Sequence, residues 1–196
     1  MNKTVDYYNK NANNYFHSTV NANMPHIYRA YLIHLPPGGK ILDAGCGSGR
    51  DSLYFLEKGY QVVAFDASVE MVKRSSQLIG QTVMLDTFEE FQWDDVFDGI
   101  WACASLLHVQ EEHMTAAIEN LARHLKPQGI FYMSFKYGEG DYEKEGRHFT
   151  CYQENSFDDL MSRVETLTIV EMFKTVDVRL DRPGEYWLNC ILRKID

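Results

Sequence analysis

The segment KILDAGCGSGRDSLYFLEKG, residues 40–59, decides the fold of this 196-residue chain. Its apolar start, Lys40–Leu42, predicts a short buried strand, and residues 50–58 predict a helix that Gly59 ends. Between them lies a turn with glycines at positions 45, 47 and 49. Because glycine has no Cβ, such a turn lets backbone amides approach a ligand closely. A glycine-rich turn between a strand and a helix is typical of α/β proteins that bind a nucleoside cofactor.

The rest of the chain continues this alternation of strands and helices. Further strands are expected at residues 61–65, 81–85, 97–104 and 130–135, with helices at about 68–78, 112–125 and 157–164. Two late strands, at about 167–176 and 187–193, are joined through Arg182-Pro183-Gly184 and are expected to pair antiparallel. The pattern predicts an α/β fold with a Rossmann-like, doubly wound, mostly parallel seven-stranded sheet that ends in an antiparallel hairpin.

The first 37 residues differ in composition from the remainder. Val5, Tyr8, Ala12 and Tyr15 recur at helical spacing, and a second helix is expected from about residue 25 to 34. Asn is a mediocre helix former, so this Asn-rich arm depends on packing for its structure. With no linker or internal repeat, we expect one domain over residues 1–196, made of a helical arm or lid (1–37) and a Rossmann-like core (38–196).

Composition excludes several classes of protein. Hydrophobic residues make up 45% and charged residues 24%, which is ordinary for a globular chain. No apolar run is long enough to span a membrane. The net charge of −9 disfavours nucleic acid and anionic lipid as partners. The four cysteines are scattered, so we expect no metal site, and the absence of a basic-then-apolar N-terminal pattern predicts a cytoplasmic location.

The charges around the glycine turn indicate which cofactor it holds. Asp66 ends the next strand 21 residues after Gly45, where a carboxylate can accept both hydroxyls of an adenosine ribose. The alternative role, capping the following helix, is already offered by Ser68. The dinucleotide fingerprint needs a small residue where this chain has Arg50. Asp43 would repel a pyrophosphate but attract an ammonium, which favours S-adenosylmethionine over NAD.

Residues 41–50, ILDAGCGSGR, resemble the first motif of the class I S-adenosylmethionine-dependent methyltransferases. Asp66, the segment FDGIWA (97–102) and the segment LKPQGI (125–130) resemble later landmarks of that superfamily, in order and at suitable distances. The match covers about residues 38 to 136 and the terminal hairpin. Within the superfamily, the layout and the segment Ser105–His108 are similar to the short, tellurite-resistance-like methyltransferases, a branch that acts on small molecules.

The resemblance implies a cofactor site at the carboxyl ends of the strands. The methionine part would be held by Asp43, Ala44, Gly45, Cys46, Gly47, Ser48 and Gly49, and the ribose by Asp66. The adenine would be lined by Ala67, Met71, Asp86, Thr87 and Phe88, while Ala104 and Ser105 would face the sulfonium. Tyr15 of the arm is a candidate to reach the cofactor carboxylate, and simple packing is the alternative.

Methyl transfer from a sulfonium is an in-line displacement, in which positioning and desolvation supply much of the acceleration. A general base is needed only if the acceptor must lose a proton. His108, just past the fourth strand, is the candidate catalytic residue, and the alternative is a histidine that packs or caps. Residues 136–150 are expected to form a long covering loop. Arg147 on it could grip an anionic acceptor, as could Arg179 or Arg182, unless these are merely solvated cations.

The resemblance thus implies an enzyme, a monomer or homodimer, that transfers a methyl group from S-adenosylmethionine to a small-molecule acceptor. Three alternatives stay open: a protein or RNA methyltransferase that works with a partner, a non-catalytic S-adenosylmethionine-binding module, and an NAD-dependent oxidoreductase, against which Arg50 argues. Residues 104–107 lack the Asp/Asn-Pro-Pro-aromatic motif of DNA amino-methyltransferases. This departure agrees with the acidic charge in disfavouring DNA.

Overall fold

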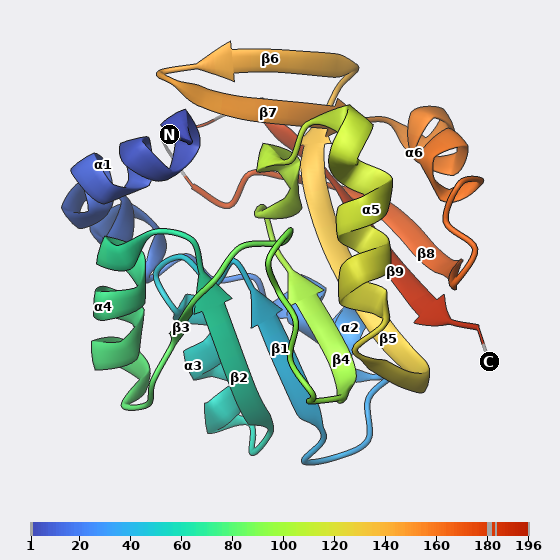
Figure 1. Ribbon diagram of the computed structural model, residues 1–196, viewed down its shortest axis with the longest axis horizontal. Coiled ribbons are helices and arrows are strands. Elements are labelled where there is room, and N and C mark those ends of the chain that lie inside the picture. The colour runs from blue at the N-terminus through green and yellow to red at the C-terminus, as the bar shows by residue number, and fades with distance from the viewer. Residues whose placement is uncertain (1, 180–181, 183, 196) are drawn as a thin grey trace.

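A computed structural model describes residues 2–179, 182 and 184–195 of the chain. Within that part, nine strands form one sheet in the order β3-β2-β1-β4-β5-β7-β6, and β9 and β8 extend it from β5 (Figure 1). The strands are β1 (Lys40–Ala44), β2 (Gln61–Asp66), β3 (Met84–Leu85), β4 (Phe97–Ala102), β5 (Leu125–Tyr137), β6 (Gly140–Lys144), β7 (Arg147–Tyr152), β8 (Leu167–Val176) and β9 (Tyr186–Lys194). The helices are α1 (Lys3–Thr19), α2 (Pro25–Leu32), α3 (Arg50–Glu57), α4 (Val69–Ile79), η1 (Leu106–His108), α5 (Glu111–Ala122) and α6 (Glu154–Met161).

The strand directions confirm the Rossmann-like, mostly parallel sheet. β3, β2, β1, β4 and β5 are parallel neighbours, whereas β9 runs antiparallel to both β5 and β8. The predicted antiparallel pairing of the last two strands is therefore correct, although Pro183 of its connection lies outside the described residues. Glycine 49 opens α3 and Ser68 caps α4 by accepting a hydrogen bond from the Met71 amide (3.2 Å).

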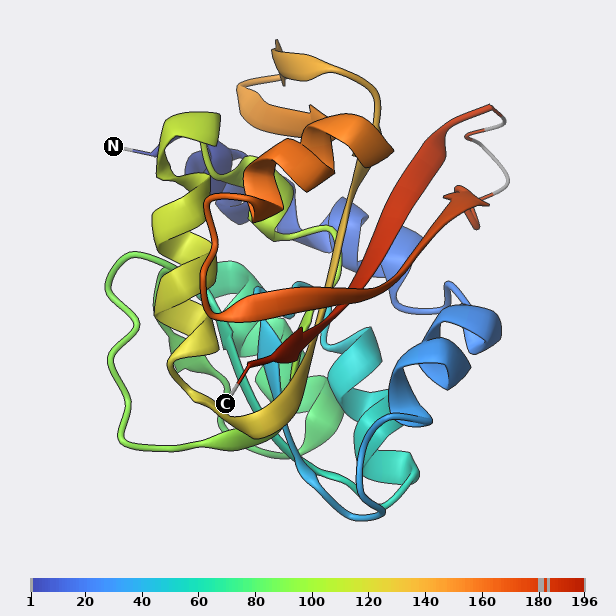
Figure 2. The ribbon, with the colours of Figure 1, turned by 90° about the vertical axis from the view of Figure 1, so that its right-hand side faces the viewer.

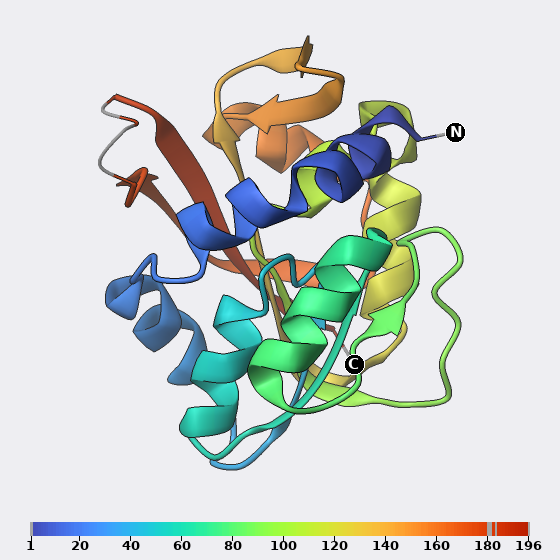
Figure 3. The ribbon, with the colours of Figure 1, turned by 90° about the vertical axis from the view of Figure 1, so that its left-hand side faces the viewer.

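The sheet is the middle of three layers (Figures 2 and 3). α5 and α6 cover one face and contribute Met114, Ile118 and Phe157 to its core. α2 and α3 cover the other face, where Tyr31 and Phe55 pack against the central strands. Burial on both faces explains why these strands read as continuous apolar runs. It also leaves the carboxyl ends of the strands as the edge where side chains can face a ligand.

The segment 136–150 is where the prediction of a long loop is wrong. Residues 140–152 instead form the hairpin β6–β7, which raises the strand number of the described sheet from the expected seven to nine. Glu145 and Gly146 both have positive φ (54° and 78°), as a two-residue hairpin turn requires. Every residue of β6 is exposed, so the strand shows none of the apolar alternation by which a strand is predicted.

Other predicted boundaries shift by a few residues. The helix expected to reach residue 125 ends at Ala122, because Leu125 already pairs with Phe97 as the first residue of β5. The third strand contains only Met84 and Leu85, and the fourth ends at Ala102 rather than at residue 104. The early end of β4 releases residues 103–105 to turn across the edge of the sheet.

α1 lies over the carboxyl ends of the central strands, between α4 and the β6–β7 hairpin (Figure 3). Two side chains of α1 attach it to these neighbours. Asn9 Oδ1 accepts a hydrogen bond from the Ser68 hydroxyl (2.7 Å), and Thr4 Oγ1 accepts one from the His148 amide (3.2 Å). The arm therefore adopts the expected helix and covers the edge where the sequence predicts a ligand.

Candidate active site

The glycine turn of residues 45–49 is closely packed on both sides. Gly45, Gly47 and Gly49 all have positive φ (76°, 53° and 78°), which favours glycine. A Cβ on Gly45 would lie 2.6 Å from the Cβ of Ser105, and one on Gly47 would lie 3.4 Å from the Tyr15 ring. The glycines thus allow the turn to fit between α1 and the residues that follow β4. This close fit is the backbone cradle that a nucleoside cofactor needs.

Asp66 links this turn to the next helix. Its carboxylate accepts hydrogen bonds from the Gly47 amide and from the Ser68 amide, each at 2.8 Å. Burial raises the pKa of Asp66, while the bonds from the backbone of Ser68 and Gly47 lower it. The carboxylate is therefore fixed at the end of β2, where a ribose would meet it.

The structure brings the residues predicted for the adenosine part into one cavity, the adenosine cavity. It is lined by the end of β2, by the residues that follow β3 and β4, and by residues of α1. Its walls include Asp66, Ala67, Met71, Asp86, Thr87, Phe88, Ala104, Ser105, Tyr15, Gly45 and Gly47. The segment 86–88 is held in place because Asp86 accepts a hydrogen bond from the Trp93 indole (3.0 Å). Asn2, which caps α1, and Thr4 and Val5 in its first turn also line the cavity.

Only some of the residues predicted for the methionine part line a cavity. Cys46 and Ser48 line a second cavity, together with Gly45 and Gly47. Ala44, Gly49 and Asp43 line neither of the two cavities. The Asp43 side chain is buried behind the turn, where it accepts a hydrogen bond from the Ser52 hydroxyl (2.6 Å) and where burial raises its pKa. In this arrangement Asp43 connects the end of β1 to α3, on the side of the turn away from the cavities.

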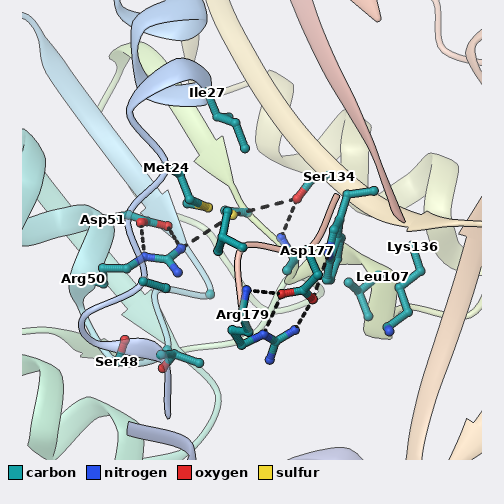
Figure 4. A pocket seen from close by; sticks show the side chains of 18 of the residues that line it. Met24, Ile27, Ser48, Arg50, Asp51, Leu107, Ser134, Lys136, Asp177 and Arg179 are labelled. Atoms are coloured by element: carbon teal, nitrogen blue, oxygen red, sulfur yellow. Dashed lines mark hydrogen bonds and ion pairs between the residues drawn. The ribbon is translucent and has the colours of Figure 1, made fainter. Parts of the chain in front are cut away.

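The second cavity, the acceptor-side cavity, extends from the glycine turn to β5, β8 and β9 (Figure 4). Ser134 and Asn189 face one another in register on β5 and β9, and both line it. Asn189 Oδ1 accepts a hydrogen bond from the Tyr132 hydroxyl (2.8 Å). Figure 4 also shows Arg179 held by Asp177 at its rim. Sequence analysis did not identify Ser134 or Asn189 as site residues. Each is a polar residue within an otherwise apolar strand, and this pattern could have indicated them.

Ala104 marks the junction of the two cavities. It has a positive φ of 52°, which is unusual for a residue with a Cβ. Its amide donates a hydrogen bond to Ser134 Oγ (2.9 Å), and the neighbouring Ser105 hydroxyl donates to the Ala44 carbonyl (2.7 Å). Strained backbone of this kind gathers at functional sites, where the surrounding structure holds it.

His108 also lines both cavities. Its Nδ1 lies 2.6 Å from the His148 carbonyl oxygen, and a carbonyl only accepts, so Nδ1 carries the proton. Its Nε2 then accepts a hydrogen bond from the Tyr8 hydroxyl of α1 (2.8 Å). Burial lowers the pKa of His108 to about 4, so the ring is neutral near pH 7. Sequence reasoning placed His108 at the site but could not identify Tyr8 as its partner.

No three His, Cys, Asp or Glu side chains of the described residues gather closely enough to hold a metal ion. None of the helices described above combines the length and apolar character of a membrane span.

Comparisons with known proteins find methyltransferases among the similar sequences and structures. Residues 41–129 match a family of methyltransferase domains. The cypemycin N-terminal methyltransferase of a Streptomyces species is 31% identical over 106 residues, which cover 51% of this chain and 43% of that protein. The chain spans about half or less of the length of the curated relatives that it matches.

Solved structures share the fold over nearly the whole chain. The 1,6-didemethyltoxoflavin-N1-methyltransferase of Burkholderia thailandensis, with bound 1,6-didemethyltoxoflavin and S-adenosylhomocysteine, superposes with a TM-score of 0.79 at 23% identity, over 98% of this chain and 85% of that one. The N-methyltransferase NodS of Bradyrhizobium japonicum WM9, in complex with S-adenosylhomocysteine, gives 0.72 at 15% identity and covers both chains fully. Residues 41–129 thus match a methyltransferase domain, and the chain shares the fold of methyltransferases whose structures hold S-adenosylhomocysteine.

Proposed function

We propose that this protein is an enzyme that transfers the methyl group of S-adenosylmethionine to a small-molecule acceptor. The observation that carries the proposal is that the adenosine cavity and the acceptor-side cavity meet. Six residues line both of them: Tyr8, Tyr15, Gly45, Gly47, Ala104 and His108. A cofactor in the first cavity would therefore adjoin an acceptor in the second, which is the arrangement that an in-line transfer needs.

The lining of the acceptor-side cavity supports a small acceptor. α1 covers it from the side of the glycine turn, and Trp187 and Phe149 contribute apolar walls. The net charge of −9 would repel the phosphates of a nucleic acid, which also disfavours nucleic acid as the acceptor. The fold neighbour from Burkholderia thailandensis holds a small molecule together with S-adenosylhomocysteine. We further propose a cytoplasmic, monomeric or homodimeric enzyme of the tellurite-resistance-like branch that residues 105–108 resemble.

Several residues of this chain would hold the cofactor, which supplies an electrophilic methyl group. Asp66 would accept the ribose hydroxyls, and Ala67, Met71 and the segment 86–88 would enclose the adenine. Ala104 would lie nearest the sulfonium. Burial raises the pKa of the nearby Cys103 thiol to about 12, so this thiol stays protonated and does not compete for the methyl group.

His108 is proposed as the residue that receives a proton when the acceptor must lose one. Its Nε2 lone pair is engaged by the Tyr8 hydroxyl, so an acceptor proton reaches it through Tyr8 or after Tyr8 moves. Burial raises the pKa of the Tyr8 hydroxyl, which therefore stays protonated and can relay a proton. For an acceptor with a free lone pair, no base is needed and His108 only positions Tyr8.

The first prediction concerns the cofactor. S-adenosylhomocysteine should raise the melting temperature of the protein, whereas NAD should not. Asp66→Ala should weaken S-adenosylhomocysteine binding roughly 10–100-fold by calorimetry, because it removes hydrogen bonds to a charged acceptor. Asp95→Ala, at an exposed carboxylate that pairs with Lys40, is the matched control and should bind normally. Stabilisation by NAD alone would contradict the assignment.

Activity is tested by the formation of S-adenosylhomocysteine from S-adenosylmethionine with a panel of small acceptors. We expect turnover with at least one of them. Turnover only with peptides or RNA would replace the small-molecule assignment with the alternative of a macromolecular substrate. Tight binding without turnover on any acceptor would indicate a non-catalytic binding module.

A second prediction is that α1 acts as a lid over residues 38–196. Amide hydrogen exchange in residues 5–19 should be fast in the free protein and slow when S-adenosylhomocysteine is bound, because the ligand adds contacts to Tyr8 and Tyr15. Exchange in α5, on the face of the sheet, is the internal control. A chain without residues 1–20 should still melt cooperatively but bind the ligand weakly. Equal protection of α1 with and without ligand would identify it as part of the folding core.

The third prediction uses the lowered pKa of His108. In the unfolded chain His108 takes up a proton near pH 6.5, whereas in the folded chain it does so near pH 4, so stability falls as the pH drops below 6.5. Between pH 7 and pH 5 the unfolding free energy should fall about 1–2 kcal/mol more for the unaltered protein than for His108→Gln. His113→Gln, at an exposed histidine, should behave like the unaltered protein. Identical pH slopes for the unaltered protein and His108→Gln would show that His108 is not buried as a neutral ring.

A further inference from the structure

The arginines at the acceptor-side cavity differ in how their guanidinium groups are paired. Arg50 donates to both oxygens of Asp51, from Nε at 2.6 Å and from Nη2 at 2.9 Å. Arg179 likewise donates from Nε and Nη2 to the two oxygens of Asp177. Both forks are therefore satisfied by a carboxylate of the chain itself.

Arg147, the first residue of β7, is different. It is only 7% exposed and lines the same cavity. Within the described residues its Nη2 donates a hydrogen bond to Glu145 (2.7 Å), its guanidinium also interacts with the Tyr8 hydroxyl, and its Nε is fully buried without a hydrogen-bond partner. A guanidinium carries five N–H donors, and burying unpaired donors is unfavourable. Arg147 thus has spare donors where water cannot satisfy all of them.

Aromatic rings hold this guanidinium beside the catalytic end of the cavity. Its central carbon lies 3.9 Å from the centroid of the Tyr7 ring and 5.3 Å from that of Phe149. Phe149 also packs against the His108 ring, with centroids 5.0 Å apart. Arg147 therefore lies near His108 and the proposed site of methyl transfer, although its segment was expected to be a loop.

The charges around the cavity have the opposite sign to those of the chain. Among the described residues, its lining contains five cationic side chains, Arg50, Lys136, Arg147, Arg179 and Arg182, and two carboxylates, Asp51 and Asp177. Glu185, which is not a lining residue, pairs with Lys136 and lies 3.7 Å from Arg182. The chain as a whole has a net charge of −9. A bound sulfonium would add further positive charge. A cationic acceptor would be repelled here, whereas an anionic one would be attracted.

We propose that Arg147 binds an anionic group of the methyl acceptor, a carboxylate or a phosphate, so that the substrate is a small anionic molecule. The inference rests on the proposed function, because it places the acceptor in this cavity. Glu145 occupies one donor of the guanidinium from the exposed hairpin turn, where it also accepts a hydrogen bond from the Tyr7 hydroxyl (3.3 Å). A substrate anion would compete with Glu145 for Arg147.

This competition allows a test with two variants that should act in opposite directions. Benzoate, phenyl phosphate and neutral benzamide are titrated into the protein saturated with S-adenosylhomocysteine, at constant ionic strength set with chloride. We expect the anions to bind at least 10-fold more tightly than benzamide, and the comparison of the two anions shows whether the site prefers a carboxylate or a phosphate. Arg147→Gln should weaken anion binding roughly 10–100-fold. Glu145→Gln should leave it unchanged or tighten it.

Control variants separate this role from a structural one. Arg163→Gln, at an exposed arginine 3.7 Å from Glu111, should bind anions like the unaltered protein. Arg147→Lys keeps the charge without the planar fork and should retain part of the binding, which covers the case in which Arg147→Gln does not fold. If Arg147→Gln and Glu145→Gln weaken binding alike, Arg147 only ties α1 to the hairpin and the inference is wrong. Equal binding of benzoate and benzamide would overturn it too.

The same experiment distinguishes this inference from the proposed function. S-adenosylhomocysteine binding is measured first, without any anion, and its absence would contradict the proposed function alone. The anion titration is repeated without S-adenosylhomocysteine, so that Arg147 is tested in either case. Normal S-adenosylhomocysteine binding without any preference for anions would overturn only the anionic acceptor.

Discussion

The carboxylate of Asp66 accepts hydrogen bonds from the Gly47 amide and the Ser68 amide, and it thereby holds the glycine turn against the start of α4. The Phe65 carbonyl adds to this constraint by accepting from the amides of Gly45 and Cys46, both at 3.0 Å. On its other side, the turn can lie close to the residues that follow β4 only because Gly45 has no Cβ to meet Ser105. Both cavities border this turn, so the proposed positions of cofactor and acceptor follow from it.

The cover over this edge comes from segments far apart in the sequence. Tyr7 and Tyr8 of α1 reach Glu145 of the β6–β7 turn and His108 of η1. These contacts place aromatic rings of α1 along the acceptor-side cavity, where they would shield a proposed displacement, in which charge is dispersed, from part of the solvent. The same contacts bury Arg147 and the neutral ring of His108. The burial of Arg147 and the neutral state of His108 thus both depend on the position of α1.

Much of the fold was predictable from local patterns. The strand, glycine turn and helix of residues 40–59, and the acid that ends β2, are short-range signals that the structure confirms. The β6–β7 hairpin was not predictable, because β6 is exposed on every residue and its turn uses Glu145-Gly146 instead of the common Asn-Gly or Asp-Gly. In the candidate site, the adenosine positions follow from strand ends, but the hydrogen bond of Asp43 to Ser52 and the incomplete pairing of Arg147 depend on tertiary contacts.

The central claim is that a cofactor in the adenosine cavity adjoins an acceptor in the cavity lined by Arg147. A crystal structure of the complex with S-adenosylhomocysteine measures this directly. The account predicts that Asp66 accepts hydrogen bonds from the ribose hydroxyls and that the cofactor sulfur lies at Ala104, open to the side of Arg147. A cofactor bound elsewhere, or with its sulfur turned away from the acceptor-side cavity, would contradict it.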